Sequence, residues 1–185
     1  TSANEVGRVS VLALDNTVTF TPSADYEPAT KKYVDDNSTS TNVATFQDLR
    51  TSGTDGGSSS IGWQQRVFND TIYNNITGLS LLSNQFTVPS GTFDLSGYTL
   101  SYGAATNRYQ SKLIRISGGA FTDIPFGSTT AIGSSSLVNS RVTFASETVI
   151  EIQSYFQTAK AVDGLGRATS SGAGEVYAQL NFKEI

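Results

Sequence analysis

The sequence predicts an all-β fold, and three observations carry this prediction. Short apolar runs recur throughout residues 61–185, and turn-forming residues separate them. Apolar and polar residues alternate in the clearest runs, as they do along a strand with one buried face. No long window shows a helical period, and charged residues make up 15% of the chain, against the roughly 25% typical of soluble proteins. Serine, threonine, asparagine and glycine are abundant where charged residues would be usual, and this composition suits short strands joined by tight turns.

The expected strands follow one another along the chain. They span residues 66–68, 71–73, 86–88, 92–102, 109–116, 120–126, 137–145, 148–156 and 175–183. In the run 148–156, Ile150 and Ile152 share one face, while Glu151 and Gln153 point the other way. The residues expected in the core are Phe93, Ile150, Ile152, Val176 and Phe182. About eight to ten short strands in roughly 125 residues imply a β-sandwich, for which a jelly roll is one of the few topologies.

Residues 1–60 differ in character and are expected to form an N-terminal neck and linker. Pro28 can begin a helix of about two turns that runs to Asp36, which is marginal in isolation and needs a partner. A second helical turn is expected at 46–50. The stretch 51–60 has no apolar residue and indicates a flexible linker. The predicted organisation is therefore a neck segment and linker at 1–60 and a head domain at 61–185.

The composition argues against several classes of function. The chain has no cysteine and no histidine, so it has no disulfide, no thiolate metal site and no Ser-His-Asp triad. Its net charge of −4 disfavours a nucleic-acid partner, and no apolar run approaches the roughly 20 residues that span a bilayer. Asp123 and Asp163 are possible calcium ligands, but their spacing resembles no dedicated calcium loop. We therefore expect no cofactor and no metal site.

An enzyme is not expected, although carboxylates are present. A glycosidase needs two carboxylates at a defined separation. The carboxylates available for such a pair are Asp94, Asp123, Asp163, Glu147, Glu151 and Glu175. Depolymerases of this kind usually stand on β-helices with repeating rungs, and the chain has no internal repeat. Gly164–Arg167 lacks the lysine and the further glycine of a phosphate-binding loop and is interpreted as a connection between strands.

An ordered series of motifs covers nearly all of the C-terminal part of the chain. The motifs are VFNDT at 67–71, NNITG at 74–78, FTVPSGTF at 86–93, NRYQSKL at 107–113, EIQ at 151–153 and GEVY at 174–177. In this order they resemble the C1q/TNF-like jelly roll found in many bacteriophage fibre proteins. Separately, PATKKYVD at 28–35 is similar to a segment that recurs in phage tail fibres just before a distal module.

The resemblance implies a homotrimer that belongs to a virion and is assembled in the host cytoplasm. The candidates for the trimer interface are Tyr33, Val34 and Tyr177, the last of which is either an interface residue or part of ordinary sheet packing. The expected function is host attachment by the distal domain of a tail fibre, which binds a surface glycan or an outer-membrane protein. The N-terminal part would join other virion proteins.

Receptor or glycan contacts are expected from aromatic, amide and arginine side chains in the loops. The candidates are Tyr102, Asn107, Arg108, Tyr109, Tyr155 and Arg167. The alternative function is structural: a trimerisation cap, or a capsid decoration or spike fibre, that does not itself bind a receptor. A secreted C1q-like ligand is a more distant alternative, because the chain has neither a collagen-like repeat nor a cysteine.

Overall fold

The computed structural model describes residues 41–103, 108–120, 122–125, 127 and 135–185. These residues belong to a compact unit that spans Thr41–Ile185. The predicted helix at 28–36, with Tyr33 and Val34, lies outside the described residues, as does Asn107.

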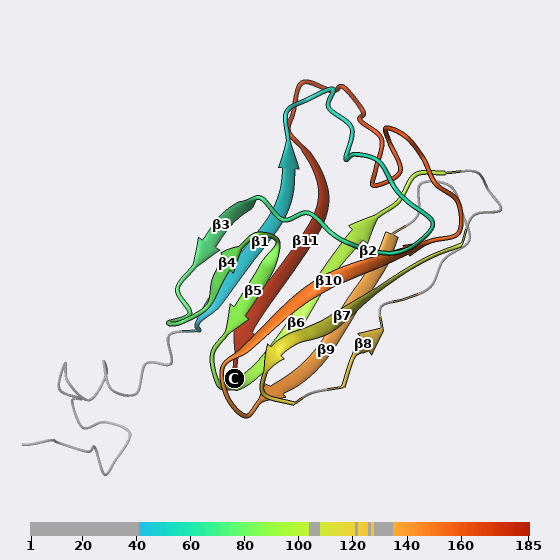
Figure 1. The fold of residues 1–185 in the computed structure, drawn as a ribbon. Coiled ribbons are helices and arrows are strands. Elements are labelled where there is room, and N and C mark those ends of the chain that lie inside the picture. The colour runs from blue at the N-terminus through green and yellow to red at the C-terminus, as the bar shows by residue number, and fades with distance from the viewer. Residues whose placement is uncertain (1–40, 104–107, 121, 126, 128–134) are drawn as a thin grey trace, which may run out of the picture. The chain divides into compact units, whose positions relative to one another are not determined.

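Two antiparallel sheets make up this unit (Figure 1). The five-stranded sheet has the order β3 (Asp70–Asn74), β1 (Val43–Arg50), β11 (Glu175–Glu184), β6 (Gly91–Leu100) and β9 (Ser135–Phe144). The six-stranded sheet has the order β4 (Ser80–Leu82), β5 (Gln85–Val88), β10 (Thr148–Phe156), β7 (Tyr109–Gly118) and β8 (Ile124–Pro125), and β2 (Gly62–Gln65) also pairs with β10. The predicted all-β sandwich is confirmed, and the described residues contain no helix.

The core lies between the two sheets and is rich in phenylalanine. Phe46 of β1 meets Phe86 of β5 edge-on, with ring centroids 5.2 Å apart, and Phe182 of β11 at 5.9 Å. Such edge-to-face contacts are a favourable geometry for aromatic rings. Of the expected core residues, Phe93, Ile150, Ile152 and Phe182 are buried in this cluster.

Val176 is only partly buried, and the reason is a β-bulge. The ladder between β1 and β11 shifts register between Asp48 and Leu49, opposite Val176 and Ala178. The simple alternation of β11 is broken there: Tyr177 and Ala178 are both buried, and the two-residue period then continues to the end of the strand. The predicted place of Val176 in the core is therefore wrong.

The sandwich begins earlier in the chain than residue 61, where the sequence placed the start of the head domain. Residues 46–50 are part of β1 and pair with β11, so the predicted helical turn there is wrong. A short segment has little helical stability of its own, and pairing with β11 satisfies its backbone.

Residues 51–60, which the sequence assigned to a flexible linker, pack on the sandwich. Gly56 donates its backbone N–H to Gly166 O at 2.9 Å, and Leu165 donates to Gly57 O at 3.1 Å. Ser59 and Lys160 exchange two backbone hydrogen bonds of 2.8 and 2.9 Å. Residues 56–59 of this segment are therefore held by residues 160–166.

Candidate functional site

Loops gather at the end of the sandwich opposite the C-terminus (Figure 1). They are the segments 51–61, 101–103 and 157–174. Arg66 supports them from beneath: it is fully buried, and its Nη2 donates to Leu165 O at 3.2 Å and to Tyr177 O at 2.9 Å. Tyr102 donates its backbone N–H to Gly164 O at 3.1 Å. These bonds fix the loops to one another and to the strands.

An aromatic and cationic cluster lies on these loops and consists of Tyr102, Lys160 and Arg167. Arg167 Nη1 donates to the Tyr102 hydroxyl oxygen at 2.6 Å, and its Cζ lies 5.2 Å from the ring centroid. Lys160 Nζ lies 4.4 Å from the same centroid and 3.1 Å from Asp163 Oδ1. Two cations on one ring form cation–π contacts. The hydrogen bond to Tyr102 raises the pKa of the Arg167 guanidinium.

Tyr102 and Arg167 are two predicted site residues that the fold brings into contact. They are far apart in sequence, and neither the pairing nor the contribution of Lys160 could be read from a motif. We call this set the loop-end cluster. It offers a tyrosine ring and two cationic groups at the molecular surface, which suits hydrogen bonding and stacking with a polar ligand.

Tyr109 does not belong to a surface site, so its prediction as a contact residue is wrong. It is 3% exposed and packs against Phe156 and Leu165. Its hydroxyl donates to Thr99 Oγ1 at 2.7 Å, within a buried network that also includes Ser111 and Ser154. Burial of the tyrosine is acceptable because its hydroxyl finds partners there.

Arg108 and Tyr155 are not part of the loop-end cluster. Arg108 is exposed, and its backbone N–H donates to Gln157 Oε1 at 3.2 Å. Tyr155 lies on the outward face of the six-stranded sheet and meets Trp63 of β2, with ring centroids 5.5 Å apart. Trp63 was not predicted, although it is the single tryptophan of the chain.

Tyr177 is covered by the chain itself. It is 2% exposed, and its hydroxyl donates to Thr54 O at 2.8 Å. Its ring lies against Gly56 and Gly166, where an added Cβ would collide with it. Burial raises the pKa of this phenol to about 12. Tyr177 is therefore a packing residue within this chain, and the loops leave almost none of its side chain exposed to a neighbouring subunit.

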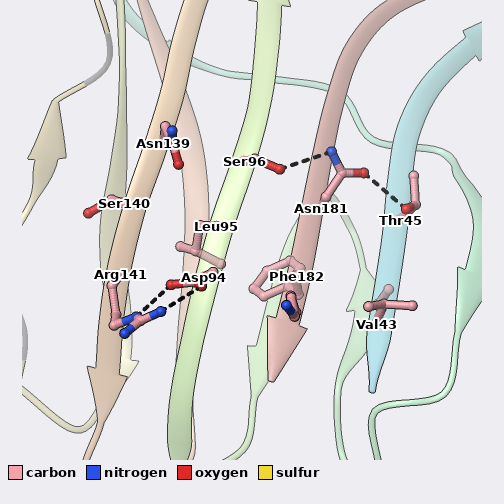
Figure 2. A pocket seen from close by; sticks show the side chains of 12 residues that line it. Val43, Thr45, Asp94, Leu95, Ser96, Asn139, Ser140, Arg141, Asn181 and Phe182 are labelled. Atoms are coloured by element: carbon pink, nitrogen blue, oxygen red, sulfur yellow. Dashed lines mark hydrogen bonds and ion pairs between the residues drawn. The ribbon is translucent and has the colours of Figure 1, made fainter. Parts of the chain in front are cut away.

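A depression of about 540 Å³ on the five-stranded sheet is lined by polar and apolar residues of β1, β6, β9 and β11 (Figure 2). Arg141 of β9 makes a two-pronged ion pair with Asp94 of β6, with N–O distances of 2.7 and 2.8 Å. This hydrogen bonding lowers the pKa of Asp94. Thr45 Oγ1 donates to Asn181 Oδ1 at 2.9 Å, and Asn181 Nδ2 donates to Ser96 Oγ at 3.4 Å. The polar groups of this face therefore bond largely to one another.

The two aspartates considered as calcium ligands are each paired with a lysine. Asp123 lies 3.4 Å from Lys112, and Asp163 lies 3.1 Å from Lys160. Within the described part of the chain, no group of three or more acidic side chains is arranged to hold a metal ion. No helix there is long and apolar enough to cross a membrane.

Solved structures share this fold, although no family model and no curated protein sequence matches the chain. Murine APRIL at pH 5.0 is 11% identical, with 78% of this chain and 99% of that chain covered and a TM-score of 0.51. The globular domain of zebrafish complement 1qA protein is 14% identical, with 78% and 97% covered and a TM-score of 0.47. The likeness shows the fold alone: the chain has the C1q/TNF-like jelly roll that the sequence predicted. The assignment to a phage fibre stays a prediction.

Proposed function

We propose that this chain is the distal head of a bacteriophage tail fibre, which attaches the virion to its host by binding a surface glycan or protein. The observation that carries the proposal is the loop-end cluster of Tyr102, Lys160 and Arg167 on firmly held loops. Binding of this kind needs recognition and no bond chemistry, so the proposed activity is non-enzymatic. The segment PATKKYVD at 28–35 supports a fibre origin and a role of the N-terminal part in joining other virion proteins.

We further infer that the chain acts as a homotrimer. The outward face of the five-stranded sheet carries two large exposed side chains near its edges, Tyr73 (51% exposed) on β3 and Leu137 (62% exposed) on β9. Three copies around an axis would cover such residues. A trimer also presents three loop-end clusters together, which multiplies a weak contact through avidity.

The test uses the full chain, purified and fluorescently labelled, on susceptible bacteria. The protein should bind these cells and block infection by the phage that carries it. Arg167→Ala should weaken cell binding by about tenfold or more, because it removes one cation and the bond to Tyr102. Arg115→Ala is the matched control, because it removes an exposed arginine from β7 that is not part of the loop-end cluster. Absence of cell binding and of inhibition at saturating concentration would reject the proposal.

A structural role is the second candidate, and the exposed Tyr73 and Leu137 favour it. In this case the head registers and locks three chains, in a fibre or as a capsid decoration or spike, without receptor contact. Deletion of residues 41–185 would then abolish assembly. Replacement by an unrelated trimer-forming domain would restore infectivity, an outcome that a receptor-binding head does not allow.

A further inference from the structure

The single tryptophan of the chain stands on the surface. Trp63 of β2 is 42% exposed, although an indole ring usually contributes more to stability when it is buried. Tyr155 of β10 contacts it edge-on, at a centroid distance of 5.5 Å and an interplanar angle of 61°. Lys112 of β7 places its Nζ 4.7 Å from the centroid of the indole ring. Three strands thus hold one aromatic ring at the surface in a defined place.

The strand register extends this group into a flat polar surface. Trp63 is opposite Tyr155, which is opposite Gln110. The next row in the same register is Gln65, Gln153 and Lys112. Residues opposite one another, and those two apart along a strand, share a face of a sheet. We call these side chains, together with Gln85 and Glu151, the tryptophan face.

A buried carboxylate orients the amides of the tryptophan face. Glu151 is only 6% exposed and accepts hydrogen bonds from three glutamines. Its Oε2 accepts from Gln65 Nε2 at 2.7 Å and from Gln85 Nε2 at 3.1 Å, and its Oε1 accepts from Gln153 Nε2 at 2.8 Å. The nitrogen of each amide is thereby fixed on the carboxylate of Glu151, and the oxygen of each amide points away from this carboxylate. No described residue donates to the amide oxygens of Gln85 or Gln153, or accepts from the indole N–H of Trp63.

We propose that the tryptophan face binds a neutral saccharide, with one sugar ring stacked on Trp63. The hydroxyls of that sugar donate to the amide oxygens of Gln153 and Gln85 and accept from the indole N–H. The ordered amides lower the cost of binding, because few side chains have to be immobilised. The inference rests on the proposed function only in taking the sugar to be part of a bacterial surface polysaccharide.

The charges of the tryptophan face select a neutral ligand over two other classes. An anionic sugar would meet the carboxylate of Glu151, and the nearest cation, Lys112, is already paired with Asp123 at 3.4 Å. An apolar peptide would have to desolvate several glutamine amides around one indole ring without satisfying them. A polyhydroxylated ring offers both an apolar face and hydroxyl groups to these amides.

Intrinsic fluorescence reads this site directly, because Trp63 is the only tryptophan. The protein is titrated with three neutral probes, which are maltohexaose, cellohexaose and a neutral O-antigen polysaccharide freed of lipid and core sugars. Polygalacturonate is titrated beside them as the anionic comparison. We expect a saturable change in emission with at least one of the neutral probes, together with reduced quenching by iodide. If none of the three gives a saturable change, the proposal is wrong. A change produced only by polygalacturonate and abolished by salt also overturns it, in favour of an anion site.

Variants separate stacking from amide recognition, with calorimetry as the readout where the fluorophore is lost. Trp63→Ala should weaken saccharide binding by about tenfold or more, and Trp63→Phe should restore part of it, because a ring remains. Gln153→Ala should weaken binding by a smaller factor. Ile185→Ala, which removes an exposed apolar side chain at the C-terminus, is the control and should leave the affinity unchanged. Equal affinities for all four variants and the native protein would overturn the proposal.

The two proposals fail separately. In one outcome the native protein and Trp63→Ala bind cells and block infection equally well, and no saccharide signal is seen. This result supports the attachment function and rejects saccharide binding at the tryptophan face. A saturable saccharide signal without any cell binding supports the tryptophan face and rejects the attachment function.

Discussion

The two outward faces of the sandwich both carry polar groups, yet they differ in how these groups are satisfied. On the five-stranded sheet, Arg141 pairs with Asp94, and Asn181 bridges Thr45 and Ser96. On the six-stranded sheet, one buried carboxylate holds three amides and leaves amide oxygens and an indole N–H without described partners. Polarity alone therefore does not mark a binding face. Ordered groups with remaining hydrogen-bonding capacity do.

The largest expected effect concerns the five-stranded face. If this face lies against neighbouring subunits, Leu137→Lys will place a charge in the interface, and the trimer will dissociate. Light scattering coupled to gel filtration should then give the mass of one chain in place of three. Trp63→Lys, on the other face, should leave the trimer intact. A trimer that survives Leu137→Lys would move the interface away from this sheet.

An intermediate effect is expected from the carboxylate of the tryptophan face. Glu151→Ala removes the acceptor of three glutamine amides, one of the buried pairings of this sheet. We expect the free energy of unfolding to fall by about 1–3 kcal/mol, and saccharide binding to be lost with it. Urea denaturation measures the first change, and Glu151→Gln, which keeps an acceptor oxygen, should recover part of it. A Glu151→Ala protein with native stability and native saccharide affinity would contradict the idea of ordered amides.

The smallest effect is expected from Asp94, whose pairing with Arg141 is exposed to solvent and salt. The hydrogen bond from Arg141 lowers the pKa of Asp94 below its ordinary 3.8. The ionised Asp94 carboxylate therefore contributes its full stabilisation of the fold above the ordinary pKa. This contribution is lost as the pH falls through the lowered pKa of the folded state. Asp94→Asn should be less stable than the native chain at pH 7, and the difference should shrink towards pH 2 and in high salt. A difference that grows on acidification would show that the carboxylate is not held in its charged form.

Much of the fold could be predicted from the sequence because it depends on local alternation. Ala178, Leu180 and Phe182 fall on one face of β11 as the two-residue period requires, and they are buried. The errors arise where the deciding contact is distant. Residues 46–50 resemble a helical turn by themselves, and only their pairing with β11 makes them a strand. The bulge that buries Tyr177 is equally a property of two strands and not of one.

The candidate site could be predicted only in part, for the same reason. Tyr102 and Arg167 were chosen by side-chain type, and the fold brings them together at 2.6 Å. Tyr109 is also a tyrosine but is buried, because its hydroxyl finds partners on two other strands, Thr99 of β6 and Ser154 of β10. Trp63 was missed since β2 is a strand of only four residues, and it becomes one by pairing with β10. Its neighbours in the structure are far away in the sequence.

The pairing of β1 with β11 has a consequence for how the protein is made. The first strand of the described sandwich hydrogen-bonds along most of its length to the last, with Val43 opposite Lys183 and Arg50 opposite Glu175. During synthesis β1 emerges early and exposes Phe46 without its partner until β11 leaves the ribosome. Contacts between residues so distant in sequence also make folding slow. For most of its synthesis, such a nascent chain can associate with other chains through the unpaired β1. We therefore expect chaperones that hold unfolded chains to bind it at this stage.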